Sequence, residues 1–161
     1  MKPVTDSILH GLRDPTKFAE GNYEVLLLAG EALAKHSMVD YNTGGICPEV
    51  DACEISAVDS KRIVDALLVC YKNTSCAGTR SGILHALGKA RDPSLVDFFR
   101  QQLIEFTTLL LLANGAIFQA MIGLSNFDEA ILDGGGSITD VDANLAEARR
   151  YLAQNGTLLP W

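Results

Sequence analysis

Residues 106–127 contain no charged residue, and we expect the rest of the chain to pack around them. The run combines strong helix formers with Gly115 and Gly123, which let neighbouring backbones come close. A helix that is apolar on nearly every side must be surrounded by other elements or by lipid. Asn114 and Gln119 and the lack of a flanking basic cluster favour a core helix over a membrane span. The run is therefore predicted to be the central helix of the core.

Apolar residues recur at helical spacing in further segments on both sides of this run, and no segment requires a strand. Ser60 is predicted to cap one of these helices, and Asp128 starts a short helical continuation of the central one. The pattern thus predicts an all-α protein of about seven or eight helices. The segments are residues 5–12, 22–37, 61–73, 81–90, 95–106, 106–127, 128–133 and 142–154.

Two segments break the pattern. Residues 38–58 show no consistent period, and a loop of this length inside a compact domain is more often functional than idle. Residues 134–137 read Gly-Gly-Gly-Ser and predict a break before the last helix. With 161 residues, the chain fits a single all-helical domain spanning residues 1–161.

A weak repeat runs through the helices. Residues 8–12, followed by Arg-Asp-Pro-Thr, echo residues 83–87, which precede Arg-Asp-Pro-Ser. A further shift of 34 positions reaches residues 117–121, ahead of another corner. A helix, a corner that contains Asp and a second helix resemble the HEAT-like class of α-solenoid, whose units must stack to bury their apolar faces. An irregular helical bundle is the alternative.

Motifs that carry chemistry are incomplete. Residues 82–89 resemble a phosphate loop but have the wrong spacing. Asp140 and Asp142 resemble the opening of a calcium loop without its glycine and glutamate, so we interpret them as helix-start acids. The spacing of the four cysteines, at positions 47, 53, 70 and 76, favours reduced thiols over a zinc site. We therefore expect no catalytic residue, metal or cofactor. An enzyme that uses Asp and Glu around the loop at residues 47–53 is a third hypothesis, behind the binding protein and the scaffold described below.

Charge is unevenly distributed, with a net charge of −7 that argues against a nucleic-acid partner. Five acids lie between His36 and Lys61, and seven lie between Arg100 and Arg149, with no Lys or Arg in either stretch. If these stretches share one side, they create a strong local field, and otherwise they form a solubilising coat. The residues predicted to contact a partner are Asp40, Glu49, Asp51, Glu54, Asp59, Asp128, Glu129, Asp133, Asp140 and Asp142.

These features favour a binding protein over an enzyme. In size, charge and architecture the chain resembles small bacterial toxin-immunity proteins, which neutralise a basic toxin, often a nuclease, by occupying its active site. That resemblance implies a basic protein partner. The alternative is a HEAT-like scaffold or accessory subunit. The amino terminus lacks the apolar run of an export signal, so we expect a cytoplasmic protein with no membrane partner.

Overall fold

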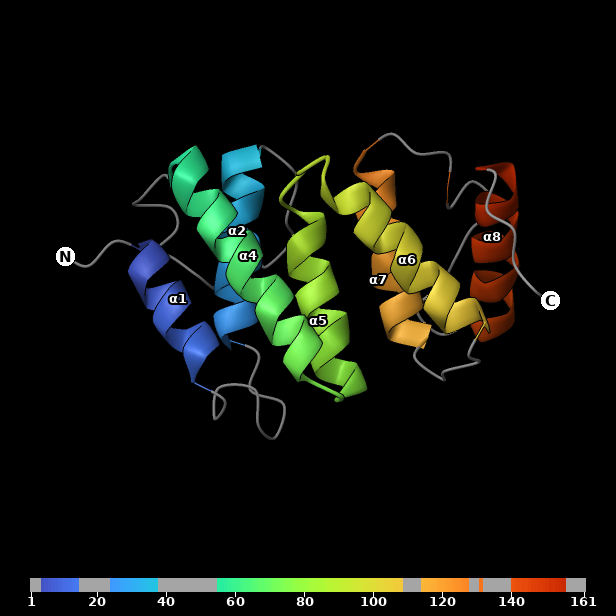
Figure 1. The fold of residues 1–161 in the computed structure, drawn as a ribbon, viewed down its shortest axis with the longest axis horizontal. Coiled ribbons are helices and arrows are strands. Elements are labelled where there is room, and N and C mark those ends of the chain that lie inside the picture. The colour runs from blue at the N-terminus through green and yellow to red at the C-terminus, as the bar shows by residue number, and fades with distance from the viewer. Residues whose placement is uncertain are drawn as a thin grey trace.

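The computed structural model describes residues 4–14, 24–37, 55–108, 114–127, 131 and 140–155. Every regular element within these ranges is an α-helix (Figure 1), which confirms the all-α prediction. None of the described helices is both long enough and apolar enough to cross a membrane. The helices are α1 (Val4–Arg13), α2 (Glu24–Ser37), α4 (Ala57–Asn73), α5 (Ala77–Gly88), α6 (Leu95–Thr108), α7 (Asn114–Ser125) and α8 (Val141–Gln154).

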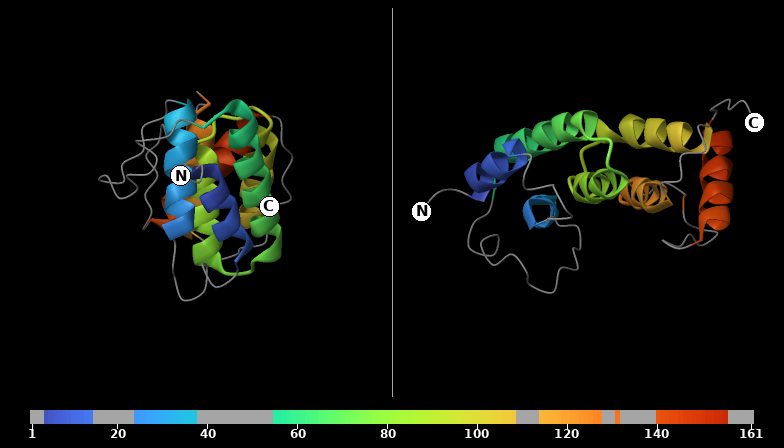
Figure 2. Two further views of the ribbon diagram at one scale, coloured as in Figure 1. Left: turned by 90° about the vertical axis from the view of Figure 1, so that its left-hand side faces the viewer. Right: turned by 90° about the horizontal axis from the view of Figure 1, so that it is seen from below.

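Six of the helices lie in two rows, with α1, α4 and α6 in one and α2, α5 and α7 in the other (Figure 2, right). The Ser37 hydroxyl at the end of α2 donates to the carbonyl of Lys89, just after α5. The Asn126 side chain, just after α7, donates to the carbonyl of Gly88 at 2.7 Å. The C-terminal ends of α2, α5 and α7 therefore lie side by side, and the three helices run in one direction. We call this side, uppermost in Figure 1, the upper edge.

The seventh described helix, α8, packs across the end of both rows, against α6 and α7 (Figure 1). Arg100 in α6 donates from Nε to the Tyr151 hydroxyl at 2.8 Å and from Nη2 to Asn155 Oδ1 at 3.3 Å. Its guanidinium also lies 5.8 Å from the centre of the Tyr151 ring. Since α6 starts at the upper edge, α8 ends near that edge and starts at the opposite one, which we call the lower edge.

The charge-free run is central to the core, but it is not one helix. Its first residues, Phe106 to Thr108, end α6, and a separate helix, α7, begins at Asn114. The prediction of a single helix over residues 106–127 is therefore wrong. Because α6 and α7 pack against each other, the chain must reverse between them. Uniformly apolar residues conceal such a reversal, since they give no change of period to mark it. The buried hydrophobic side chains described in the run are those of Phe106, Ala116, Ile117, Ala120, Met121 and Leu124.

Two glycines allow α7 to approach its neighbours. A Cβ atom added to Gly88 would lie 3.1 Å from the Cα of Gly123. A Cβ added to Gly123 would lie only 2.7 Å from Cζ of the Phe99 ring. The backbone of α7 thus touches α5 on one side and an aromatic ring of α6 on the other, which no larger residue would permit without a shift.

Two helices begin four residues earlier than the sequence pattern predicts. The N-cap of α4 is Ser56, whose hydroxyl accepts from the Asp59 amide at 3.1 Å, whereas Ser60 is buried inside the helix. Similarly, α5 begins at Ala77 and not at residue 81. Serines four residues apart both satisfy the capping preference, and the glycines of α5 weaken its helical signal. Tertiary packing overrides both local signals.

The predicted helical continuation at residues 128–133 is wrong where the structure describes it. The helix α7 ends at Ser125, a turn follows at Asn126 and Phe127, and Ile131 is buried without helical conformation. The other residues of that segment lie outside the described ranges. The same is true of residues 38–54 of the predicted loop and of the break at residues 134–137.

The copies of the weak repeat occupy two different rows. Residues 83–87 and 117–121 lie in α5 and α7, which are parallel neighbours. Gln119 and His85, which are equivalent positions 34 residues apart, form a hydrogen bond at 2.9 Å. Residues 8–12 lie in α1, in the other row, so this first copy is not equivalent to the other two.

A buried hydrogen bond joins α4 to α6. The Tyr71 hydroxyl donates to Gln102 Oε1 at 2.7 Å, and both side chains are buried. The Arg80 guanidinium lies 5.2 Å from the centre of the Tyr71 ring. Burial raises the pKa of Tyr71 to about 12, although the positive charge of Arg80 opposes part of this rise. The neutral phenol is therefore the form that the fold stabilises.

This raised pKa predicts a loss of stability at alkaline pH. The phenol has a pKa of about 10 in an unfolded chain, so its contribution is complete below about pH 10 and is lost between about pH 10 and 12. We expect the free energy of unfolding to fall by about 2 kcal/mol more in wild type than in Tyr71→Phe over that range. Urea denaturation of both proteins from about pH 8 to 12 measures the difference. Equal slopes in the two proteins would contradict the burial of the phenol.

Candidate functional site

The upper edge carries one of the predicted acids directly. His36 Nδ1 at the end of α2 lies 3.1 Å from the carbonyl oxygen of Ile55, which fixes the start of α4 at this edge. Asp59 sits in the first turn of α4, where its carboxylate pairs with Arg62 at 3.0 Å. A negative side chain is stabilised there by the helix dipole. Asp59 is therefore held at the upper edge.

Acids of both stretches follow helices that end at the same edge. The chain leaves α2 at Ser37, shortly before Asp40. It leaves α7 at Ser125 and turns through Phe127, directly before Asp128. Ser37 and Phe127 therefore lie on the side of the molecule that carries Asp59, whereas Glu105, the first acid of the second stretch, lies in the last turn of α6, away from this edge. Seven of the predicted contact residues lie outside the described ranges, namely Asp40, Glu49, Asp51, Glu54, Asp128, Glu129 and Asp133.

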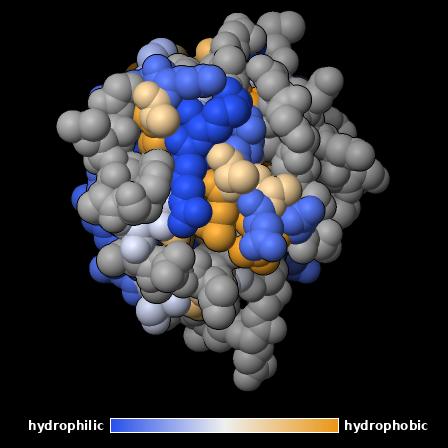
Figure 3. Space-filling model, turned by 90° about the vertical axis from the view of Figure 1, so that its right-hand side faces the viewer, coloured by the Kyte–Doolittle hydropathy of each residue, from blue (hydrophilic) through white to orange (hydrophobic). Residues whose placement is uncertain are grey.

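The remaining two predicted residues lie at the lower edge. Asp140 is the N-cap of α8, where its carboxylate accepts from the Ala143 amide at 3.0 Å, and Asp142 lies in the first turn. This confirms their interpretation as helix-start acids. Since α8 starts at the lower edge, Asp140 and Asp142 are not brought together with Asp59. Figure 3 looks onto the end formed by α8, where hydrophilic side chains adjoin a small hydrophobic area.

The helix ends themselves add negative potential to the upper edge. Each C-terminal end of an α-helix carries about half a negative charge, and α2, α5 and α7 all end here. Basic residues near these ends offset part of this potential, as do the positive N-terminal ends of α4 and α6 at the same edge. Lys35 and His36 lie in the last turn of α2, and Arg91 donates from Nε to the carbonyl of Asn126 at 3.1 Å. The upper edge therefore combines helix ends of both signs with the carboxylate of Asp59.

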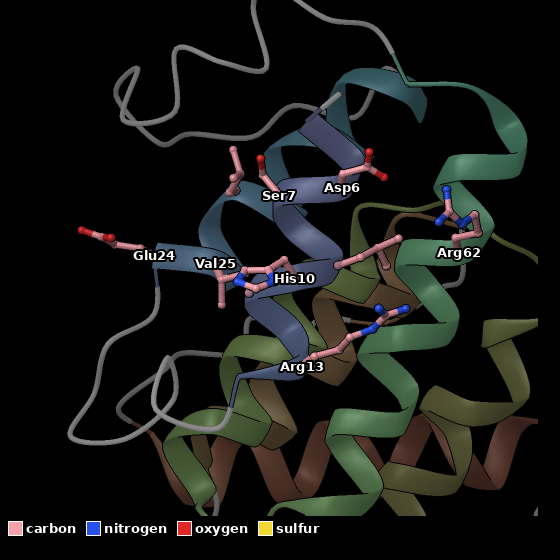
Figure 4. A pocket seen from close by; sticks show the side chains of 10 residues that line it. Asp6, Ser7, His10, Arg13, Glu24, Val25 and Arg62 are labelled. Carbon is pink, nitrogen blue, oxygen red and sulfur yellow. The ribbon is translucent and has the colours of Figure 1, made fainter. Parts of the chain in front are cut away.

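A charged cleft of about 540 Å³ lies between α1, α2 and α4 (Figure 4). At its base α1 approaches α2 closely, since both Gly11 and Val25 line the cleft and a Cβ added to Gly11 would lie 2.5 Å from Val25 Cγ2. Two acids and two arginines line the cleft, so their charges cancel and favour neither an anion nor a cation. The labelled side chains are Asp6, Ser7, His10, Arg13, Glu24, Val25 and Arg62.

A smaller hollow of about 250 Å³ crosses the row of α2, α5 and α7. His85 and Gln119 meet in it, and burial lowers the pKa of His85 because it disfavours the charged imidazole. Leu26, Leu27 and small residues of α5 complete its lining. The hollow therefore combines an apolar wall with one hydrogen-bonded polar pair.

The two described cysteines are free thiols in different settings. Cys70 donates to the Leu12 carbonyl at 3.2 Å, and burial raises its thiol pKa. Cys76 is exposed at the start of α5, where hydrogen bonds from Thr79 and Gly78 lower its pKa. The part of the chain that the structure describes holds no group of His, Cys, Asp or Glu arranged to bind a metal ion. Cys47 and Cys53 lie outside it.

Comparison with known proteins finds no matching family model, no matching curated protein and no matching solved structure. The upper edge and the clefts are therefore the features that bear on function.

Proposed function

We propose that this protein binds a basic protein partner at its upper edge and inhibits it, as an immunity protein does with a basic toxin such as a nuclease. The observation that supports this function is that the helices preceding Asp40 and Asp128 end at the edge that carries Asp59. The ends of α2, α5 and α7 add negative potential at the same place. Carboxylates of a binding surface can occupy the sites where a nuclease binds phosphates.

Electrostatic attraction would act mainly on the rate of encounter. Complementary charges raise the association rate of two proteins, and salt screens the effect over a Debye length of about 8 Å at physiological ionic strength. Exposed acids at the rim should therefore influence association more than dissociation. The partner should bind quickly at low salt and more slowly as the salt concentration rises.

Two matched charge reversals test the proposal. The first variant, Asp51→Lys with Asp128→Lys, changes one acid of each stretch, and we call it the upper-edge variant because the proposal assigns both acids to the binding surface. The lower-edge control is Glu24→Lys with Asp142→Lys, which changes net charge equally. Glu24 and Asp142 are exposed at the starts of α2 and α8. Wild-type protein first captures its partner from extracts of the native host, and stopped-flow mixing then measures association. We expect at least about a tenfold loss of association rate for the upper-edge variant and less than about twofold for the control.

Equal losses in both variants would place the binding surface elsewhere. Failure to capture any basic protein would reduce the acidic stretches to a solubilising coat.

A scaffold function is the second candidate, favoured by the hollow across α2, α5 and α7. We propose for this alternative that the two rows are the stacked helix pairs of a HEAT-like α-solenoid, in which parallel helices of one row line an extended binding surface. A scaffold's partner would lie along that row. Its binding would survive the upper-edge reversals and fail when Gln119 in the hollow is replaced by Arg.

A further inference from the structure

An exposed apolar stripe follows one side of α4. Val58 and Val69 are 71% and 58% exposed, the highest values among the large hydrophobic side chains of the described residues. The two valines are eleven residues apart. In an α-helix this separation corresponds to three full turns plus about 20°, so both side chains lie on the same side of α4. Arg62 and Asp65 lie between them on the same side. We call these four residues the α4 stripe.

The α4 stripe lies on the side of α4 opposite its buried residues, which include Ile63, Leu67 and Tyr71, and the exposure of Val58 and Val69 shows that no other described helix covers these two side chains. A groove of about 680 Å³ adjoins it, lined mainly by apolar side chains that include Leu12, Ala66 and Val69. Asp65 lies on the rim of this groove. The groove therefore offers space for an apolar side chain next to a carboxylate.

We propose that the α4 stripe binds a second copy of this chain, with the two α4 helices antiparallel. A two-fold axis between residues 63 and 64 places Val58 against Val69 of the second copy. The same axis places Arg62 against Asp65 of the second copy. Because the symmetry repeats each contact, the stripe is complementary to itself in both charge and hydrophobicity. Val58 of one copy then fills the groove beside Val69 of the other.

The existing ion pairs of the stripe do not prevent this arrangement. Arg62 pairs with Asp59 at 3.0 Å and Lys61 pairs with Asp65 at 3.1 Å, each within α4, the first pair partly and the second largely exposed to solvent. Exposed pairs of this kind contribute little to stability, so exchanging them for pairs between copies costs little. One pair of helices buries less than the about 1,600 Å² of a standard interface, so we expect a dissociation constant in the micromolar range.

Sedimentation equilibrium of the full chain, from about 1 to 500 µM, tests the dimer and its interface. Wild type is expected to shift from monomer to dimer mass. Arg62→Asp and Asp65→Arg should each weaken the dimer at least about tenfold, because each brings like charges together. The double variant restores opposite charges and should recover wild-type association within about threefold. Asp97→Arg is the control, since the Asp97 side chain is 96% exposed on α6 in the same row.

Val69→Ser supplies a test that changes no charge and should also weaken the dimer. Circular dichroism of every variant confirms that the helices are intact. A wild-type chain that stays monomeric throughout the range would overturn the proposal. So would a dimer that neither single reversal weakens, or a double variant that remains as weak as the single ones.

Discussion

Replacing Phe99 with Ala is expected to lower the free energy of unfolding by about 3–5 kcal/mol. The Phe99 side chain is fully buried in α6 and lies against the bare backbone of Gly123 in α7. Its ring also packs edge-to-face on Phe98, with centroids 5.7 Å apart. Removing the ring leaves a cavity between α6 and α7, and Gly123 offers no side chain to fill it.

Phe98→Ala is the matched control, since the neighbouring ring is only partly buried. Urea denaturation followed by circular dichroism measures both variants, and we expect the loss for Phe98→Ala to be clearly smaller. If Phe99→Ala cost no more than Phe98→Ala, the contact between α6 and Gly123 would not carry the stability assigned to it.

Ile117→Ala should cost about 2–5 kcal/mol, because the Ile117 side chain is only 1% exposed in the middle of α7. This tests whether the charge-free run lies at the centre of the core. Ile122→Ala is the control on the same helix, since Ile122 is half-buried. The melting midpoint of Ile117→Ala should fall well below that of Ile122→Ala. An unchanged midpoint for Ile117→Ala would mean that α7 is not part of the core. Leu111, in the same run, lies outside the described residues.

The all-α class and most helices could be predicted from the spacing of apolar residues. α2 and α8 differ from their predicted bounds by no more than two residues, since each has a clear apolar side. The sequence pattern does not predict that the charge-free run is divided between α6 and α7. Uniformly apolar residues show no period, so nothing in the pattern marks the chain reversal before Asn114. The sequence does not decide whether α4 starts at Ala57 or at Lys61, because both Ser56 and Ser60 are residues that commonly cap a helix.

The composition of the acidic surface was visible in the sequence, but its arrangement was not. Helix direction decides which acids share an edge, and direction follows from packing. Asp59 and the ends of α2 and α7 share an edge because α2, α5 and α7 run in one direction and because His36 holds the start of α4 beside the end of α2. Asp142 lies at the other edge because Arg100 fixes the last turn of α8 near the start of α6. No local pattern at residues 140–142 could have shown this.

The most direct test of the binding edge is a titration of isotope-labelled protein with an oligolysine peptide, followed by the amide signals of each residue. A basic ligand attracted to the upper edge should shift the signals of Ser37, Asp59 and Phe127 most. The signals of Glu24 and Asp142, at the lower edge, should move little, and added salt should remove the shifts. Shifts that are largest at Glu24 and Asp142, or equal over the whole surface, would contradict the proposal that the upper edge binds a basic partner.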